Sequence, residues 1–514
     1  MHPRKFIRDS VGFAFTQYIV RATLMLRGLL AARLLGPLPY GAWNAIQILM
    51  DYGVLAPFGS QQGLDQMVPP RIVEGDAAAL LRVKRAALFN ILLLTGLFTA
   101  GCLAWSMLGS SRVFNAWGFR GVALALVCVI STNIASYQAS IMRSHGDITT
   151  VSGWMLLQGA IGGVLGLAFT PWLGAWGLLF GWVAGCLVSF GYVTFRSRGM
   201  APLLPAPASE GLDLVQIGFP MFVFAASTLM MRNIDRLIIL RFLGTESLGF
   251  YSLSVMALTF ILYLPDSVSY VMYPQLLRKF GESGRDVAFI RPRVERVLQA
   301  SSVFIPALSA IAYLCARPLV LVLLPKFTPG VGAIRAICFG AAALAFSNFA
   351  SVVLMTVGRQ TVLMPAAIGA TALYAGLDMI AVKSGGGITG VAWATLTAYV
   401  VNSAMLLSMA LTGLGLEGRR VLASMSRLYA PLALAIALAF ALDHGLPWTE
   451  STNLVIRIAR LLLACAAFLA LYGLLVRPLA RGMGIRQLVS EFNLPVLGPI
   501  LRRFGSGTSS REDS

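Results

Sequence analysis

The sequence predicts an all-α polytopic membrane protein with about fourteen transmembrane helices, arranged as two pseudo-symmetric six-helix lobes followed by two further helices. Three observations predict this class. Of the 514 residues, 57% are hydrophobic and only 12% are charged, whereas a soluble protein of this length would be about one quarter charged. Apolar runs long enough to cross a bilayer recur along the whole chain. Finally, a short motif occurs once in each half of the sequence.

The repeated motif joins one apolar run to the next in both halves. Residues 33–43 read RLLGPLPYGAW, and residues 241–251 read RFLGTESLGFY. A repeat with so long a period is typical of a transporter with two similar lobes, because solenoid repeats are far shorter. Upstream, ATLMLR at 22–27 resembles STLMMR at 227–232. The paired glycines are expected to serve tight outer turns and close helix approach: Gly36, Gly41, Gly244 and Gly249.

The apolar runs place the helices and divide the chain into segments. We expect a first lobe over 1–200, a cytoplasmic linker over 201–212 and a second lobe over 213–413, followed by two helices within 414–480 and a cytoplasmic tail over 481–514. The Pro-rich stretch that begins at Ala201 marks the linker. Helices are expected over 11–35, 39–63, 86–109, 120–142, 148–169, 172–194, 213–241, 247–274, 298–324, 332–357, 361–382, 388–413, 428–443 and 456–476.

The basic residues predict the orientation of the chain and exclude several functions. With the N-terminus inside, 26 of the 40 Lys and Arg residues fall in inner segments and 10 at outer ends and loops, so both termini are expected to be cytoplasmic. The net charge of +19 therefore reflects membrane topology, and no nucleic-acid partner is expected. The loops are too short for a soluble catalytic domain. The six cysteines and three histidines show no ligand spacing, so neither a metal site nor an organic cofactor is expected.

Charged residues within the predicted helices are the candidate binding residues. A charge at mid-membrane costs about 2.5–3.5 kcal/mol on insertion scales, so it usually faces a cavity or a partner. Arg21 and Arg27 lie in the first helix, while Arg232, Asp235 and Arg236 share one face of the seventh. Asp235 can neutralise only one of its two arginine neighbours. The surplus positive charge suits an anion, and a guanidinium group suits phosphate. Snorkelling or purely structural pairing is the alternative.

Polar residues in other predicted helices are candidates for ion coupling or for lining a cavity. Asn44, Gln47 and Asp51 form a polar stripe on the second helix, and Asp266 follows a proline in the eighth. A buried carboxylate whose protonation depends on its surroundings could couple transport to protons or sodium. Asp51 is the stronger candidate, because it lies nearer a helix centre. Polar packing between helices is the alternative. Two further polar candidates share a face of the fourth helix: Asn133 and Tyr137.

The motif ARLLGPLPYGAW, its echo LRFLGTESLGFY and the pair Asp235-Arg236, together with fourteen expected helices, resemble the Wzx-type bacterial oligosaccharide flippases. These belong to the multidrug/oligosaccharidyl-lipid/polysaccharide (MOP) exporter superfamily. The resemblance covers residues 10–480 and implies the MATE-like fold. It also implies a protein of the bacterial inner membrane that moves undecaprenyl-diphosphate-linked sugar units from the inner to the outer leaflet, alongside glycosyltransferases and a polysaccharide polymerase. The residues it implies as contacts to diphosphate or anionic sugar are Arg21, Arg27, Arg232 and Arg236.

Other functions remain open at this stage. A lipid II flippase is hard to separate by sequence, whereas a drug/cation antiporter would favour an acidic or aromatic cavity. A membrane glycosyltransferase or polymerase would need a sizeable extramembrane loop, which is lacking here. A non-transporting scaffold would have little reason to keep several charges at mid-membrane. We therefore expect a transporter rather than an enzyme, with the lipid-linked oligosaccharide and membrane lipids as its partners.

Overall fold

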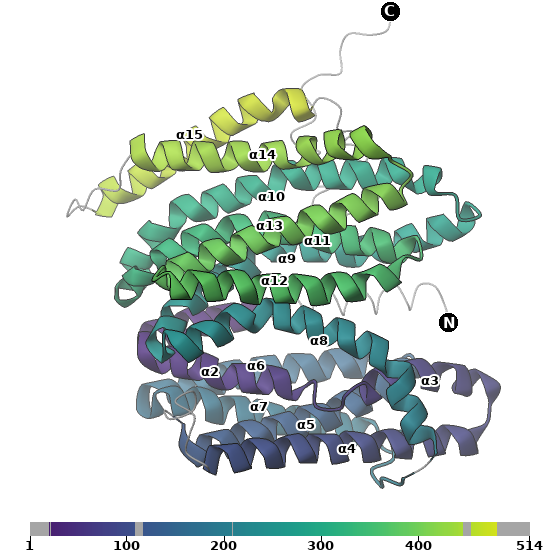
Figure 1. Cartoon of the computed structure of the whole chain (residues 1–514). Coiled ribbons are helices and arrows are strands. Elements are labelled where there is room, and N and C mark those ends of the chain that lie inside the picture. Colours follow the sequence, from purple (N-terminus) through teal and green to yellow (C-terminus); the bar gives the residue numbers. More distant parts are fainter. Residues whose placement is uncertain (1–19, 21, 108–116, 208, 446–453, 481–514) are drawn as a thin grey trace, which may run out of the picture. The chain divides into compact units, whose positions relative to one another are not determined.

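The computed structural model describes residue 20 and residues 22–107, 117–207, 209–445 and 454–480, and all regular structure in these ranges is helical. Twelve of the described helices are long and apolar enough to cross a membrane. The helix over 22–35 is followed by α2 (Pro37–Gly53), α3 (Ser60–Glu74), α4 (Ala77–Met107), α5 (Gly118–Ser144), α6 (Ile148–Leu173), α7 (Ala175–Arg196), α8 (Glu210–Phe242), α9 (Thr245–Glu282), α10 (Val287–Leu323), α11 (Val331–Thr356), α12 (Leu363–Lys383), α13 (Gly387–Gly413), α14 (Gly418–Gly445) and α15 (Leu454–Ala480) (Figure 1).

Where the structure describes them, the expected membrane helices all coincide with helical structure, but one of them is broken. The span expected over 39–63 is two helices, α2 and α3, separated by turns at 54–59. Pro57 has no backbone N–H to continue a helix, and Phe58 and Gly59 take positive φ angles of 47° and 94°. The expectation of one continuous helix was therefore wrong.

Several helices also begin earlier or end later than hydropathy predicts. Helix α4 starts at Ala77, whereas hydropathy placed its start at residue 86. Hydropathy missed the first turns because they carry Arg82, Lys84 and Arg85. Such turns are too polar for the hydropathy of a membrane span, yet long basic side chains let a helix continue into the interface.

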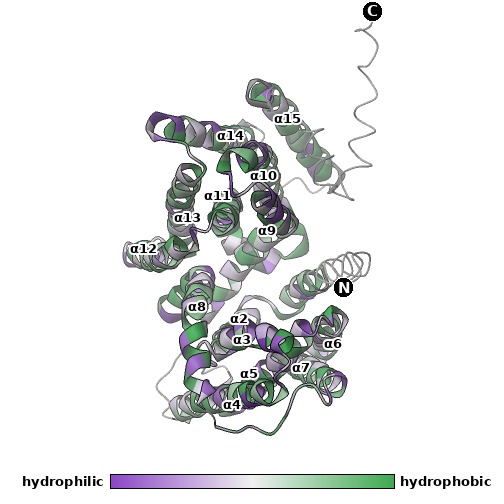
Figure 2. Ribbon diagram, turned by 90° about the vertical axis from the view of Figure 1, so that its right-hand side faces the viewer, coloured by the Kyte–Doolittle hydropathy of each residue, from purple (hydrophilic) through white to green (hydrophobic). Residues whose placement is uncertain are grey.

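The chain divides into two compact units. Unit 1 comprises 1–256, 323–330 and 367–391. In it α2 contacts α5, α7 and α8, and α3 contacts α4, α5 and α8, so the broken helix lies at the centre of the other helices (Figure 2). Helices α6 and α7 pack closely, since a Cβ on Gly181 would overlap the backbone of Gly166.

Unit 2 comprises 257–322, 331–366 and 392–514. Helix α11 is buried along most of its length, and α14 packs against both α11 and α15. Arg335 of α11 forms a bidentate pair with Asp443 of α14, with N–O distances of 2.9 and 2.7 Å, and this pair fastens the two helices together.

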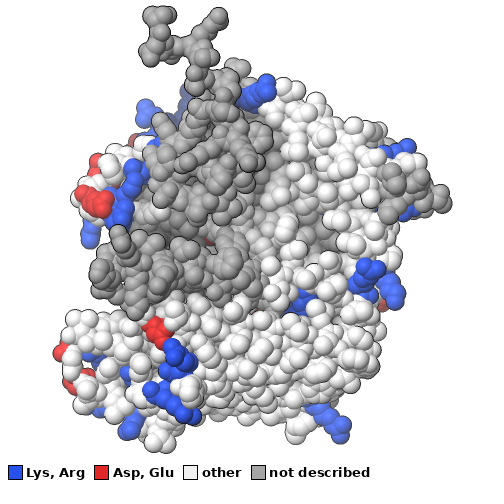
Figure 3. Space-filling model, turned by 180° about the vertical axis from the view of Figure 1, so that it is seen from behind, with Lys and Arg blue, Asp and Glu red and all other residues white. Residues whose placement is uncertain are grey.

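Surface charge agrees with a membrane environment. On the face drawn in Figure 3, most charged side chains lie toward the left and right edges of the view, and the described surface between them is mostly uncharged. An uncharged band flanked by charge is expected of a protein whose helices cross a bilayer. The structure therefore confirms the predicted class of an all-α polytopic membrane protein.

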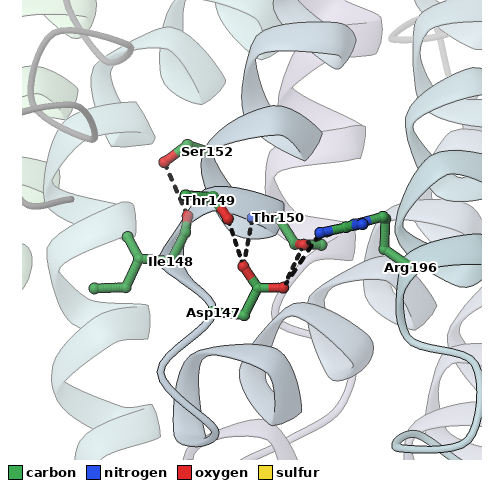
Figure 4. A network of polar contacts seen from close by, with 6 residues as sticks. All are labelled: Asp147, Ile148, Thr149, Thr150, Ser152 and Arg196. Carbon is green, nitrogen blue, oxygen red and sulfur yellow. Dashed lines mark hydrogen bonds and ion pairs between the residues drawn. The ribbon is translucent and has the colours of Figure 1, made fainter. Parts of the chain in front are cut away.

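The start of α6 shows how the polar residues of a connecting turn organise a helix end in unit 1. Asp147 is the N-cap, and its carboxylate accepts hydrogen bonds from the backbone N–H of Thr150 (3.1 Å), the hydroxyl of Thr150 (2.6 Å) and the hydroxyl of Thr149 (2.6 Å) (Figure 4). Arg196, at the end of α7, approaches the same carboxylate to 3.9 Å. Burial raises the pKa of Asp147, but these hydrogen bonds and the arginine charge outweigh it and leave the pKa below its ordinary value.

Candidate functional site

The two copies of the repeated motif meet in unit 1, where α2 and α9 begin. A Cβ on Gly41 would overlap the carbonyl oxygen of Thr245, and one on Gly249 would overlap that of Pro37. The other glycine of each copy turns the chain, with φ of 77° at Gly36 and 90° at Gly244. The expectation of tight turns and close helix approach is confirmed, and this contact fixes the position of α2 beside α8 and α9.

Arg27 is a buried cation that projects from the helix over 22–35. Its side chain is 6% exposed, and its guanidinium carbon lies 5.2 Å from the ring centroid of Trp43 on α2 and 4.9 Å from that of Trp182 on α7. Both distances allow cation–π attraction. The Nε and Nη1 atoms are buried and make no hydrogen bond within the described residues. Arg27 therefore keeps donors available in a site from which water is largely excluded.

Arg236 is a second buried cation, on α8. Its Nη1 donates to the amide oxygen of Asn233 at 2.8 Å, and its Nη2 donates to that of Asn44 on α2 at 3.1 Å. Asn44 in turn donates to the carbonyl oxygen of Tyr40 at 2.8 Å. Because its two side-chain partners are neutral amides, Arg236 is held in place without losing its charge. Tyr40 lies close enough to Arg27 and Arg236 to interact electrostatically with both.

Asp235 lies beside Arg236 in the chain but forms no ion pair with it. Its carboxylate accepts a hydrogen bond from the hydroxyl of Tyr251 on α9 at 2.6 Å and one from the backbone N–H of Arg236 at 2.7 Å. The residue is 3% exposed. The carboxylate therefore joins α8 to α9, and the guanidinium group points toward α2 instead. The neutralising pair suggested by the spacing of these residues does not form.

Two further candidates extend this cluster along α2. Gln47 and Asp51 are half-buried on the helix that carries Asn44. Asp51 is close enough to Arg236 for the two charges to interact, yet its carboxylate makes no hydrogen bond or ion pair within the described residues. The structure thus brings together Arg27, Asn44, Gln47, Asp51, Asp235 and Arg236.

The remaining candidates lie elsewhere. Arg232 is exposed, although the repeat aligns it with the buried Arg27, and Arg21 lies outside the described residues. Asp266 belongs to unit 2, where it accepts a hydrogen bond from Asn348 at 3.0 Å. Asn133 is buried and donates to the carbonyl oxygen of Gly53 and to Thr95, so it holds the end of α2.

Tyr137 is fully buried at the end of unit 1 where α4 begins. Its hydroxyl bonds to the carbonyl oxygens of Lys84 and Pro202, both at 3.1 Å. These contacts tie the connector between α7 and α8 to α4, which is a packing role.

Residues that sequence reasoning missed complete the surroundings of both arginines. Trp43 and Tyr251 are the aromatic residues that close the two copies of the motif, and their shared position was the available signal. Asn233 is next to the candidate arginine Arg232 in the sequence. Trp182 has no such signal, since it lies within a uniformly apolar helix. The side chains that the structure brings together at this site carry guanidinium, amide and carboxylate groups.

Comparisons with known proteins agree with this description. Residues 30–327 match the model of a family described as polysaccharide biosynthesis protein. A comparison with curated proteins finds no match. Among solved structures, the lipid II flippase MurJ in an inward closed conformation is similar, with a TM-score of 0.70 and 13% identity over 91% of this chain and 100% of that one.

Two transporters of the MOP superfamily are also similar. An inward-facing multidrug resistance transporter of the MATE family has a TM-score of 0.67 and 15% identity, over 78% of this chain and 98% of that one. A transporter from Pyrococcus furiosus has a TM-score of 0.56 and 16% identity, over 80% of this chain and 95% of that one. At these identities the likeness concerns the fold, and it confirms the predicted MATE-like architecture.

Proposed function

This chain belongs to the family of polysaccharide biosynthesis proteins, and we propose that it is a flippase for an undecaprenyl-diphosphate-linked oligosaccharide. The substrate moves from the inner to the outer leaflet of the bacterial inner membrane by alternating access. Both termini of the flippase lie in the cytoplasm. Glycosyltransferases supply the lipid-linked oligosaccharide, and a polysaccharide polymerase consumes it.

The main support for this proposal is Arg27, whose buried Nε and Nη1 donors make no hydrogen bond within the described residues. A buried guanidinium group with unbonded donors is costly unless an anion completes its surroundings. Trp43 and Trp182 stabilise the cation through their ring faces but accept no conventional hydrogen bond. A diphosphate supplies negative charge and several acceptor oxygens, and a guanidinium group binds such oxygens through two parallel N–H groups.

Arg236 is the second cation in the proposed site. Asn44 and Asn233 orient its guanidinium group without neutralising it, so its charge still attracts an anion. Asp51, which interacts with Arg236, is the candidate for coupling to protons or sodium. If protonation or sodium binding cancels the negative charge of this carboxylate near Arg236, the affinity of Arg236 for an anion depends on the coupling ion.

A matched pair of substitutions on one helix tests this function. Arg27→Gln removes the buried cation, whereas Arg33→Gln removes an exposed one. In cells that depend on this chain, Arg27→Gln should leave the protein in the membrane but abolish surface polysaccharide, and lipid-linked oligosaccharide should accumulate. Arg33→Gln should behave as wild type. Normal polysaccharide export with Arg27→Gln would exclude the proposed site.

The same cells separate the two rival transport functions. For a lipid II flippase, loss of the chain would instead arrest peptidoglycan synthesis. For a drug/cation antiporter, it would change drug sensitivity and leave both polymers unaffected.

A further inference from the structure

A cavity lies in unit 1, away from Arg27 and Arg236. Its volume is about 510 Å³, and it is an open cavity bordered by the first two turns of α4, the last turn of α7 and the connector that follows α7. On α4 the lining residues are spaced as one helix face. The lining consists of Ala77, Leu80, Leu81, Lys84, Thr194, Ser197, Arg198, Gly199, Met200, Ala201, Pro202 and Leu203.

Lys84 is the feature that distinguishes this cavity. The residue is only 6% exposed, and its Nζ donates to the carbonyl oxygen of Met200 at 2.9 Å. An ammonium group has three donors, and the ammonium group of Lys84 makes no second hydrogen bond and no ion pair within the described part of the chain. A buried ammonium group without a carboxylate partner is costly, and a bound anion would remove that cost.

The other charge in the cavity has the same sign. Arg198 lies over the ring of Phe195 at 4.8 Å and has no ion pair within the described residues. Nearby Arg82, by contrast, is paired with Glu210 at 3.0 Å. The N-terminal end of α4 also borders the cavity, but the carboxylate of Asp76 caps it and accepts a hydrogen bond from the backbone N–H of Ala79 at 2.9 Å. The positive charge of the cavity thus comes from Lys84 and Arg198. The electrostatics of the cavity therefore favour an anion.

The walls of the cavity are held in place by hydrogen bonds. The hydroxyl of Tyr137 bonds to the carbonyl oxygens of Lys84 and Pro202, and the backbone N–H of Ala206 bonds to the carbonyl oxygen of Arg85 at 3.4 Å. These bonds fix the connector against α4. A cavity with fixed walls pays less ordering entropy on binding than a mobile loop would.

The position and rim of the cavity identify the kind of anion. It lies where α4 begins and α7 ends, at the level of lipid headgroups for two membrane-spanning helices. Apolar side chains at its edge are exposed, including Leu81 at 40%, Met200 at 41% and Leu203 at 51%. A soluble anion would leave these apolar side chains exposed, whereas the acyl chains of a lipid would cover them.

We propose that this cavity binds the phosphate headgroup of an anionic phospholipid, with the acyl chains over the apolar rim. The phosphate accepts hydrogen bonds from the two free donors of Lys84 and interacts with Arg198, so the bond from Lys84 to Met200 persists. Basic pockets between transmembrane helices are a common way to bind lipid headgroups. This site is separate from the one proposed for the diphosphate, and its test requires no transport.

The experiment compares lipid retention by native mass spectrometry of the full chain, delipidated and then exposed to phosphatidylglycerol, phosphatidylcholine or inorganic phosphate. We expect retention of phosphatidylglycerol only. Lys84→Gln and Arg198→Gln should each weaken it roughly fivefold to tenfold. Arg120→Gln, which removes an exposed arginine from the first turn of α5, should have no effect.

A second pair of variants keeps every charge and guards against misfolding of the lysine variant. Ala77 and Ala78 are both exposed in the first turn of α4, but only Ala77 lines the cavity. Ala77→Phe fills the cavity and should abolish retention, whereas Ala78→Phe should retain lipid as the wild type does. Equal retention by both variants would overturn the proposal. So would equal retention of phosphatidylcholine, or displacement of phosphatidylglycerol by millimolar inorganic phosphate.

Discussion

Gly41 and Gly249, which hold equivalent positions in the two copies of the repeated motif, lie directly against each other. A Cβ on Gly41 would stand 2.8 Å from the backbone nitrogen of Gly249, a distance that real Cβ atoms do not adopt. The duplication therefore brings its two copies into contact. Through this contact α2 and α9 approach closely enough for Asn44 and Tyr251 to reach Arg236 and Asp235 of α8.

The first prediction concerns this contact. Gly41→Ala should lower the free energy of unfolding of the purified protein by about 3 kcal/mol or more, because the new methyl group meets backbone atoms rather than a side chain that can move. Gly96→Ala on α4 is the control, since a Cβ there has nothing within 4 Å and should leave stability unchanged or slightly raised. The measurement is the unfolding temperature in detergent. Equal unfolding temperatures for the two variants would contradict the close contact.

Much of the fold was predictable because long apolar runs leave few alternatives to membrane helices. The break within 39–63 was not expected, because Val54, Leu55 and Ala56 continue the apolar run up to the break. Pro57 and Gly59 were the visible signals, but either residue can also occur inside a membrane helix. Only the backbone conformation distinguishes a break from a kink.

The candidate site was predictable in part. Charge at mid-membrane selected Arg27 and Arg236, and both are buried. The same criterion selected Arg232, which is exposed, because the spacing along α8 cannot tell which turn meets α2. Trp182 was beyond sequence reasoning, since only the packing of α7 against the first helices brings its ring to Arg27. Burial of a membrane arginine depends on the neighbouring helices more than on its own.

A second prediction concerns the hydrogen bond between Tyr251 and Asp235. Tyr251→Phe removes only the hydroxyl group, so one oxygen of a buried carboxylate loses its donor, at a cost of about 1–3 kcal/mol. The unfolding temperature should fall accordingly. Asp235→Asn should recover part of this loss in the double variant, since an amide needs less solvation than a carboxylate. Tyr192→Phe is the control, because the Tyr192 hydroxyl makes no hydrogen bond within the described residues. An equal fall in the unfolding temperature for both tyrosine variants would contradict a stabilising hydrogen bond from Tyr251 to Asp235.

A third prediction concerns pH and the N-cap of α6. Asp147→Asn keeps one capping oxygen but removes the charge and the second acceptor oxygen, and both oxygens bind Thr149 or Thr150 in the wild type. The wild type should therefore be more stable at neutral pH by about 1 kcal/mol. The folded pKa of Asp147 lies below its ordinary value. The advantage is therefore complete above the unfolded pKa, about 3.9, and is lost as the pH falls through the lower folded pKa. Unfolding temperatures of both proteins between pH 7 and pH 3 measure it, and a gap that stays constant or widens in acid would contradict the lowered pKa.

The last prediction decides between Asp51 and Asp266 as the group that couples transport to an ion. Asp51 interacts with Arg236 and makes no hydrogen bond within the described residues, so a change in its charge acts directly on a cation of the proposed site. Asp266 accepts a hydrogen bond from Asn348 in unit 2. In vesicles loaded with a fluorescent lipid-linked saccharide, Asp51→Asn should abolish the dependence of flipping on an imposed proton or sodium gradient. Asp266→Asn should preserve that dependence. Substrate binding should survive Asp51→Asn, because neutralising this carboxylate leaves Arg236 with more attraction for an anion. If Asp266→Asn abolished the dependence on the gradient and Asp51→Asn preserved it, the coupling role would belong to Asp266.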